Sequence, residues 1–233
     1  QPVVQLTTGR VVGLCATPRW RSDHHGLLEP SAFMPTMIEG GMLPDLGAVL
    51  FRDISGTLFD IGAGYAQVEW VSTVLCREEI VLPGLLDQVT QVLNDAGVPG
   101  DRLRIVVSED TVLDKAALRV LLQLRRIGVH LTVHRFGTGP SSLLSLGDYP
   151  ASTIVVDRSF VDGLGRRHDD TVIVNAVAGL TSDLGLELAA DGVCDERQAQ
   201  LLEEVGCTLA QGRLFGRPAP LRHGHLEIAG AAS

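Results

Sequence analysis

The feature that most constrains the fold is a regular alternation of short apolar runs and longer amphipathic segments after residue 65. Such alternation predicts parallel strands joined by helices, and strands this continuously apolar are typical of a sheet covered on both faces. The expected strands are residues 65–72, 102–108, 130–136, 152–157, 186–191 and 208–212, and the expected helices are 82–97, 115–128, 169–185 and 195–206. Seven or eight such units in one chain favour an α/β fold of the TIM-like (β/α)8 barrel type over an open sheet.

The first residues depart from this pattern. "QPVVQLTTGRVVGLCA" pairs two apolar runs across Thr8 and Gly9, which indicates a hairpin whose second arm ends at Cys15. We therefore expect the barrel to begin with an antiparallel strand. Ser31 fits the N-cap of a following helix that breaks at Gly40 and Gly41, with a second helix from about Asp45.

Composition predicts one domain over residues 1–233, with 221–233 peripheral. The formal charge of −9 argues against bulk nucleic acid as a partner, since phosphate backbones are held by concentrated lysine and arginine. Four scattered cysteines, Cys15, Cys76, Cys194 and Cys207, suit a reducing compartment, so we expect a cytoplasmic domain. There is no long apolar segment for membrane insertion. Because the chain starts at Gln1, we expect it to be a piece of a larger multidomain signalling protein.

In a barrel of this kind, the carboxyl ends of the strands form one mouth, where functional residues gather. The residues expected there are Cys15, Trp70 or Glu69, Val106 to Glu109, His134, Arg135, Val155 to Asp157, Asp191 and Gln211.

Several of these segments carry known motifs in a consistent order. They are "RW" at residues 19–20, "EPSAFMP", "FGTGPSSLLSL" in place of DDFGTGYSSL, "VVDRSFV" in place of KIDRSFV, "ADGV" in place of AEGVE, and "QGRLFGRPAP" in place of QGYLFGRP. Over nearly its whole length the chain resembles the EAL-type cyclic-di-GMP phosphodiesterase domains. The resemblance implies hydrolysis of one phosphodiester bond by a water held between two divalent cations.

That chemistry needs hard oxygen ligands, and here the motif positions carry other residues. The name motif reads "CAT", with Cys15 in place of its Glu, and the Asn of the next strand falls on Trp70, or on Glu69 with a slip of one residue. The remaining replacements are Val106 for the first Glu of ExTE, His134 and Arg135 for the Asp pair, Val155 for the Lys, Asp191 for the Glu of AEG, and Cys194 for that motif's later Glu. We expect that the domain is not an active phosphodiesterase and holds no metal or other cofactor.

Other motif positions are retained. Arg19 matches the arginine that reaches a phosphate in the family, and Gln211 is also kept. Glu109 matches the residue that supports the loop after the Asp pair. That loop, here Phe136, Gly137, Thr138 and Gly139, also takes part in the family's side-by-side dimer, so the resemblance implies a homodimer.

Individual residues at the mouth have alternative interpretations. Arg135 either contacts a phosphate, or it is turned out to solvent or paired with Glu109 or Asp110. Trp70 either stacks on a base or fills the space of the missing metals, and the second is favoured because an indole buries a large apolar area. Cys15, His134 and Cys194 have the ligand types of a zinc site, but buried cysteines mostly behave as small apolar residues.

We therefore expect a catalytically inactive EAL-type domain that serves as a regulatory or protein-interaction module with an unknown protein partner. The alternative is a metal-independent cyclic-di-GMP receptor that binds through Arg19, Gln211, Asp191 and Arg135. A residual or altered phosphodiesterase activity is the remote third possibility.

Overall fold

The structure is a computed structural model that describes residues 1–64, 68–137 and 149–220. Its strands are β1 (Pro2–Gln5), β2 (Val11–Ala16), β3 (Trp20–Ser22), β4 (Gly26–Leu28), β5 (Trp70–Val74), β6 (Leu103–Ser108), β7 (His130–His134), β8 (Thr153–Val156), β9 (Glu187–Ala190) and β10 (Leu209–Ala210). Its helices are α1 (Pro30–Glu39), α2 (Leu43–Gly62), α3 (Arg77–Ile80), α4 (Leu85–Ala96), α5 (Glu109–Leu113), α6 (Lys115–Arg126), α7 (Arg158–Val161), α8 (His168–Asp183) and α9 (Glu196–Glu204), with a 3₁₀ turn at Gly100–Arg102.

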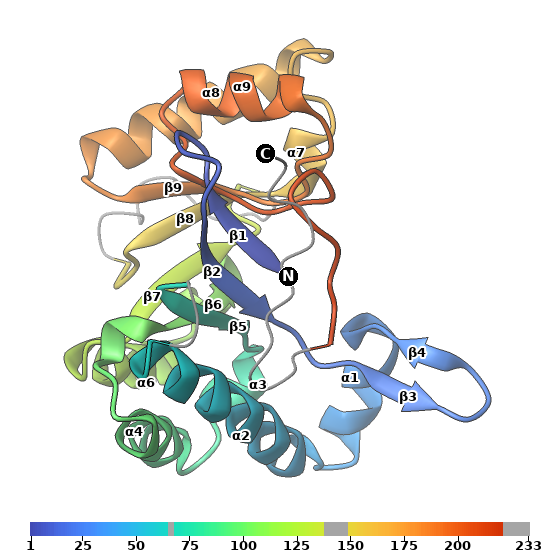
Figure 1. Cartoon of the computed structure of the whole chain (residues 1–233), viewed down its shortest axis with the longest axis vertical. Helices are drawn as coiled ribbons and strands as arrows, with labels where there is room; N and C mark the ends of the chain where they lie inside the picture. The colour runs from blue at the N-terminus through green and yellow to red at the C-terminus, as the bar shows by residue number, and fades with distance from the viewer. Residues whose placement is uncertain (65–67, 138–148, 221–233) are drawn as a thin grey trace.

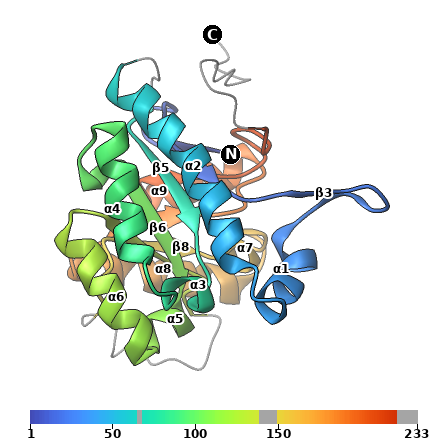
Figure 2. The ribbon, with the colours of Figure 1, turned by 90° about the horizontal axis from the view of Figure 1, so that it is seen from below.

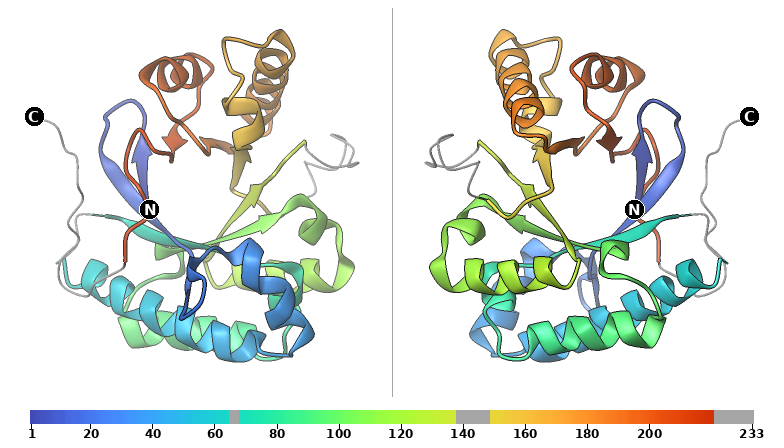
Figure 3. Two further views of the ribbon diagram at one scale, coloured as in Figure 1. Left: turned by 90° about the vertical axis from the view of Figure 1, so that its right-hand side faces the viewer. Right: turned by 90° about the vertical axis from the view of Figure 1, so that its left-hand side faces the viewer.

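Eight of these strands close into a barrel in the order β1-β10-β9-β8-β7-β6-β5-β2. β1 is antiparallel to both of its neighbours, and the other pairs are parallel. Helices α2, α4 and α6 cover one side of the barrel and α8 and α9 another (Figures 1 and 3). The TIM-like (β/α)8 barrel with an antiparallel first strand is thus confirmed.

The hairpin β3–β4 stands apart from the barrel beside α1 (Figure 2). Trp20 of this hairpin meets Phe33 of α1 edge to face, with ring centroids 6.2 Å apart. The expectation for the start of α1 was wrong: Pro30 opens the helix and Glu29, not Ser31, occupies the N-cap position. Proline suits the first helical position because its fixed φ is already helical and its missing N–H would have no partner there.

Two apolar cores follow from the alternation of side chains along the strands. The larger one lies between the barrel and its helices and includes Ile54, Leu58, Ile105 and Leu121, all fully buried. The smaller one fills the barrel interior and consists of Val3, Val12, Cys15, Trp70, Ala189 and Leu209. The interior is thus partly a packed core, and the candidate site lies within it.

Candidate functional site

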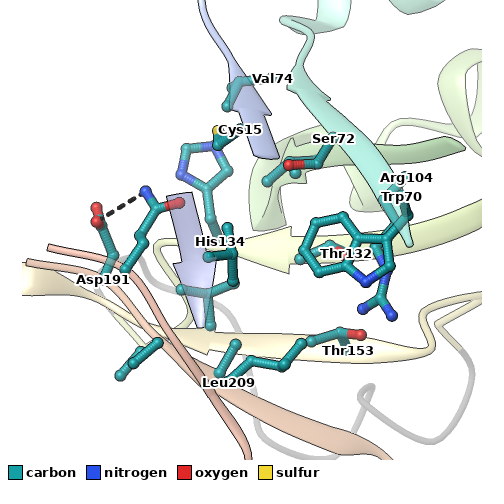
Figure 4. Close-up of a pocket in the computed structure, with 17 residues that line it drawn as sticks. Cys15, Trp70, Ser72, Val74, Arg104, Thr132, His134, Thr153, Asp191 and Leu209 are labelled. Carbon is teal, nitrogen blue, oxygen red and sulfur yellow. Dashed lines mark hydrogen bonds between the residues drawn. The ribbon is translucent and has the colours of Figure 1, made fainter. Parts of the chain in front are cut away.

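The barrel interior holds a cavity of about 100 Å³ (Figure 4). Along β5, β6, β7 and β8 it is lined by alternate residues, because every second side chain of a barrel strand points inward, whereas consecutive residues at the ends of β9 and β10 also reach it. The lining residues are Val3, Cys15, Trp70, Ser72, Val74, Arg104, Val106, Thr132, His134, Thr153, Val155, Ala189, Ala190, Asp191, Leu209, Ala210 and Gln211. We call the end near the amino ends of β5, β6, β8 and β9 the floor, and the opposite end the mouth.

The floor is a connected polar and aromatic network. Arg104 donates from a terminal guanidinium nitrogen to Glu187 Oε2 at 2.7 Å, and the Thr153 hydroxyl donates to the same oxygen at 2.9 Å. The guanidinium carbon of Arg104 lies 4.0 Å from the centre of the Trp70 ring, a cation–π contact. A buried charge is tolerated where a counter-ion and hydrogen bonds replace its hydration, and Arg104 has the counter-ion Glu187 and one hydrogen bond to it, while its buried Nε has no hydrogen-bond partner among the described residues.

Trp70 is tightly enclosed on the side facing β2. Gly13 is its register partner, and a Cβ at residue 13 would come within 2.5 Å of the indole ring. Glycine at this position therefore makes room for the aromatic side chain. The Trp70 side chain is buried, with 6% of its surface exposed.

The mouth is built differently. Cys15 lies beside Ser72 in the β2–β5 register, and the Ser72 hydroxyl donates to the Leu14 carbonyl at 3.3 Å. Asp191 follows β9 and accepts a hydrogen bond from the Gln211 side-chain amide at 2.9 Å (Figure 4). With His134 at the end of β7, these residues put a thiol, a hydroxyl, an imidazole, a carboxylate and an amide around the opening.

Burial determines the protonation of two of these groups. It raises the pKa of the Cys15 thiol, so the thiol form is favoured. Burial and the neighbouring Arg135 lower the pKa of His134, while Asp157 and Asp191 act in the opposite direction. The mouth therefore presents a neutral thiol and an imidazole biased toward its neutral form.

The expected position of Trp70 at the mouth was wrong. Trp70 is the first residue of β5, and Glu69 is an exposed residue that precedes the strand, so both lie at the floor end. The residue of β5 that lies beside Cys15 is Ser72. Trp70 does fill space in the barrel, but it packs on Gly13 and Arg104 rather than at the strand end where metal ligands were sought.

Several other expected site residues lie away from the cavity lining, among them Arg135, Arg19 and Cys194. Arg135 is exposed and adopts a left-handed backbone with φ of 56°, which turns the chain at the end of β7. Arg19 bridges Glu29 at 2.8 Å and donates to the Pro18 carbonyl. Cys194 donates its thiol to the Gly192 carbonyl at 2.9 Å. Val106 and Val155, by contrast, line the cavity as expected.

Glu109 contacts the described residues on either side of the gap between Gly137 and Tyr149. Its carboxylate accepts the Gly137 backbone N–H at 3.3 Å and the Tyr149 hydroxyl at 3.5 Å, and the residue is almost fully buried. Phe136 is buried and Gly137 is exposed. Thr138 and Gly139, the other two residues of the expected dimer loop, lie outside the described residues.

The donor set does not fit a pair of divalent cations. Mg²⁺ and Mn²⁺ are held by several carboxylate and carbonyl oxygens, and Asp191 is the one carboxylate among the residues that line the cavity. Within residues 1–64, 68–137 and 149–220, no three His, Cys, Asp or Glu side chains are grouped so as to hold a metal ion. In the same ranges, no helix has the length and apolar character needed to cross a membrane.

Sequence reasoning missed Ser72, Thr132, Arg104 and Thr153 as cavity residues. The period-2 pattern of β6 offered one signal, because Arg104 stands two residues before Val106 and must share its face. Glu187, its partner, is 83 residues away and belongs to a strand that is not adjacent in the sheet. Nothing in the local sequence indicates that pairing.

Comparison with known proteins agrees with this architecture. A family model described as the EAL domain matches residues 1–218. The bifunctional diguanylate cyclase/cyclic di-GMP phosphodiesterase MucR of Pseudomonas aeruginosa is 34% identical over 224 residues, covering 94% of this chain and 32% of that protein. The cyclic di-GMP phosphodiesterase NbdA of the same organism is also 34% identical over 224 residues, covering 95% of this chain and 28% of that protein.

Solved structures give the same result. The MucR phosphodiesterase in complex with c-di-GMP superposes with a TM-score of 0.87 at 33% identity, covering 94% of this chain and 90% of that one. The EAL domain of Mycobacterium smegmatis DcpA gives 0.74 at 26% identity, covering 93% and 88%. The chain spans about a third of the length of the curated relatives it matches. On the strength of the family model, the relatives and the shared barrel, the chain belongs to the EAL domain family.

Proposed function

We propose that this EAL domain has no phosphodiesterase activity and acts as a regulatory or protein-interaction module in bacterial cyclic-di-GMP signalling. The observation that carries the proposal is the donor set at the mouth. Asp191 is the one carboxylate of the cavity lining, and it already accepts a hydrogen bond from Gln211.

A water activated between two cations requires that both metals be held while positions stay open for water and phosphate. A buried neutral thiol at Cys15 and a valine at residue 106 do not supply oxygen ligands to Mg²⁺. A single carboxylate leaves most of the cation charge uncompensated. The signalling context comes from the relatives, whose names include cyclic di-GMP phosphodiesterases.

Turnover of cyclic-di-GMP tests the proposal directly. The purified domain is incubated with the dinucleotide and Mg²⁺ or Mn²⁺, beside the MucR phosphodiesterase domain as a positive control. We expect product formation no faster than in buffer. Metal-dependent hydrolysis that is lost in Asp191→Asn would overturn the proposal.

A nucleotide receptor is the competing function, and the c-di-GMP complex of the MucR domain is what favours it. Against it, the retained Arg19 is engaged with Glu29 and lies outside the cavity lining. Calorimetric titration with cyclic-di-GMP, with and without Mg²⁺, distinguishes the interaction module from the nucleotide receptor. We expect no binding heat, whereas metal-independent binding that disappears in Arg19→Ala would establish the receptor.

A homodimer through the Phe136 to Gly139 region is part of the proposal. Its support is the resemblance of this loop to the family's dimer loop, together with the anchoring of Gly137 by Glu109. Sedimentation velocity over a range of concentrations checks it. If the domain is still a monomer at the highest soluble concentration, the proposed homodimer is wrong.

A further inference from the structure

Helix α6 carries an exposed stripe that the barrel does not use. Lys115, Arg119, Leu122 and Arg126 follow one another at spacings of four, three and four residues, and all four side chains are exposed. With 3.6 residues per turn, they lie within about 60° of one another around the helix axis. We call this set the α6 stripe. The opposite face of α6, with Ala117, Leu121 and Leu124, is fully buried against the barrel core.

The three cations of the stripe have no counter-ions within the described part of the chain. Lys115, Arg119 and Arg126 form neither an ion pair nor a side-chain hydrogen bond there, whereas Arg77, Arg104 and other arginines are paired with carboxylates. Helix α6 contains no acidic residue. Its N-cap residue Asp114 is engaged with the amides of Ala116 and Ala117 and with Arg77.

The stripe also includes an apolar centre. Leu122 is 42% exposed and stands between Arg119 and Arg126 on the same face. An exposed leucine flanked by cations suits an amphipathic partner. Burying the leucine removes apolar surface from water, and the charges orient the partner. This arrangement calls for a complementary occupant with an apolar residue between acidic ones.

The net charge of the whole chain limits which class of partner can bind the stripe. The formal charge of −9 repels any extended anionic surface, such as a lipid bilayer, that faces much of the molecule at once. A narrow segment responds mainly to charges within the screening length of about 8 Å at physiological salt. A symmetric contact between the stripes of two copies would bring like charges together. The observations therefore favour a slender acidic partner.

We propose that the α6 stripe docks an acidic amphipathic helix of a partner protein, with glutamates or aspartates facing Lys115, Arg119 and Arg126 and an apolar side chain on Leu122. The partner's helix lies along α6, so that its acidic positions follow the same helical spacing. The inference names a partner class for the interaction role proposed above and rests on that role for its biological meaning.

The test uses the whole domain and a fluorescent synthetic helix with glutamates and a leucine at the stripe spacing. A second peptide with glutamine in place of each glutamate is the charge control. We expect saturable binding of the acidic peptide that weakens with salt, and a loss of affinity of about tenfold or more in Arg119→Glu with Arg126→Glu. Leu122→Asp should weaken binding as well.

Arg10→Glu combined with Arg21→Glu is the matched control, because it reverses the charge of two exposed arginines that lie outside α6. It should leave peptide affinity nearly unchanged, and circular dichroism confirms that each variant is folded. Three results would overturn the proposal: no saturable peptide binding, an equal loss of affinity in the control variant, or preferential binding to phosphatidylglycerol vesicles. Peptide binding is measured without nucleotide, so its failure is distinguishable from a finding of hydrolytic activity.

Discussion

The floor and the mouth are the two ends of one barrel and have opposite characters. At the floor, Arg104, Glu187, Thr153 and Trp70 form a network in which the buried charge has an acidic partner and an aromatic face. At the mouth, Asp191 and Gln211 form a single hydrogen-bonded pair among a thiol, a hydroxyl and an imidazole. We therefore expect substitutions at the floor to cost more stability than substitutions at the mouth.

The contrast predicts a large loss of stability when the floor aromatic is removed. Trp70→Ala deletes a buried indole and the ring over Arg104, so the free energy of unfolding should fall by about 3–5 kcal/mol. Urea denaturation measures it. Cys15→Ala at the mouth is the reference and should cost about 1 kcal/mol, because a buried cysteine acts as a small apolar residue. Similar losses in both variants would abolish the distinction.

Glu187 at the start of β9 and Asp191 just after it allow a sharper comparison of the floor with the mouth. Glu187→Gln leaves the guanidinium of Arg104 without a counter-ion and should lower the free energy of unfolding by about 2 kcal/mol, allowing for the partial exposure of Glu187. Asp191→Asn keeps a hydrogen-bonding oxygen for Gln211 and should cost less than about 1 kcal/mol. If Asp191→Asn were the more damaging change, the mouth would be the structural end.

Lowering the pH should destabilise the domain partly through His134 at the mouth. Folding lowers the pKa of His134 below its ordinary value of 6.5, so the unfolded chain takes up a proton first as the pH falls. His134 therefore costs no stability well above pH 6.5, and the free energy of unfolding decreases as the pH falls from there toward the lowered pKa. His134→Gln should reduce the slope of unfolding free energy between pH 7 and pH 5, measured by denaturation at each pH.

His130 at the amino end of β7 is a second source of that slope. Burial and then Arg104 lower its pKa, with Asp101 and Glu187 opposing. Comparing His130→Gln, His134→Gln and the variant with both changes shows how much of the pH dependence of the unfolding free energy comes from each end of the barrel. An unchanged slope in His134→Gln would mean that the mouth histidine is as hydrated in the folded chain as in the unfolded one.

The smallest expected effect is that of divalent metal. Because the cavity lining offers one carboxylate, millimolar Mg²⁺ or Mn²⁺ should leave the melting temperature unchanged, since a ligand stabilises only the state that binds it. Differential scanning calorimetry with the MucR phosphodiesterase domain as a control makes the comparison. A concentration-dependent rise in melting temperature here would show a metal site that the geometry does not indicate.

The sequence predicts the barrel well because strand and helix periodicities are local properties. The hairpin around Thr8 and Gly9, the helix over residues 115–126 and the parallel strands all follow from apolar spacing and turn residues. The position of Trp70 was misjudged because Ser72 and Thr73 are polar and resemble the end of a strand. In the structure they are inside β5, which continues to Val74.

The site could be predicted only in part. Alternation places Cys15, Val106, His134 and Val155 inside the barrel, and all four line the cavity. Whether a long side chain such as Arg135 or Arg19 turns inward depends on partners distant in sequence, here Glu29 for Arg19. The contact of Gly13 with Trp70 likewise depends on strand register, which closure of the barrel determines.

The ion pair between Arg104 and Glu187 has a mechanical consequence. It connects β6 with β9, two strands separated in the ring by β7 and β8, so it acts as a cross-brace through the barrel rather than as one more link around its circumference. A braced ring keeps its shape when residues at its other end are exchanged. Substitutions at the mouth should therefore leave the barrel folded, because the brace lies at the opposite end.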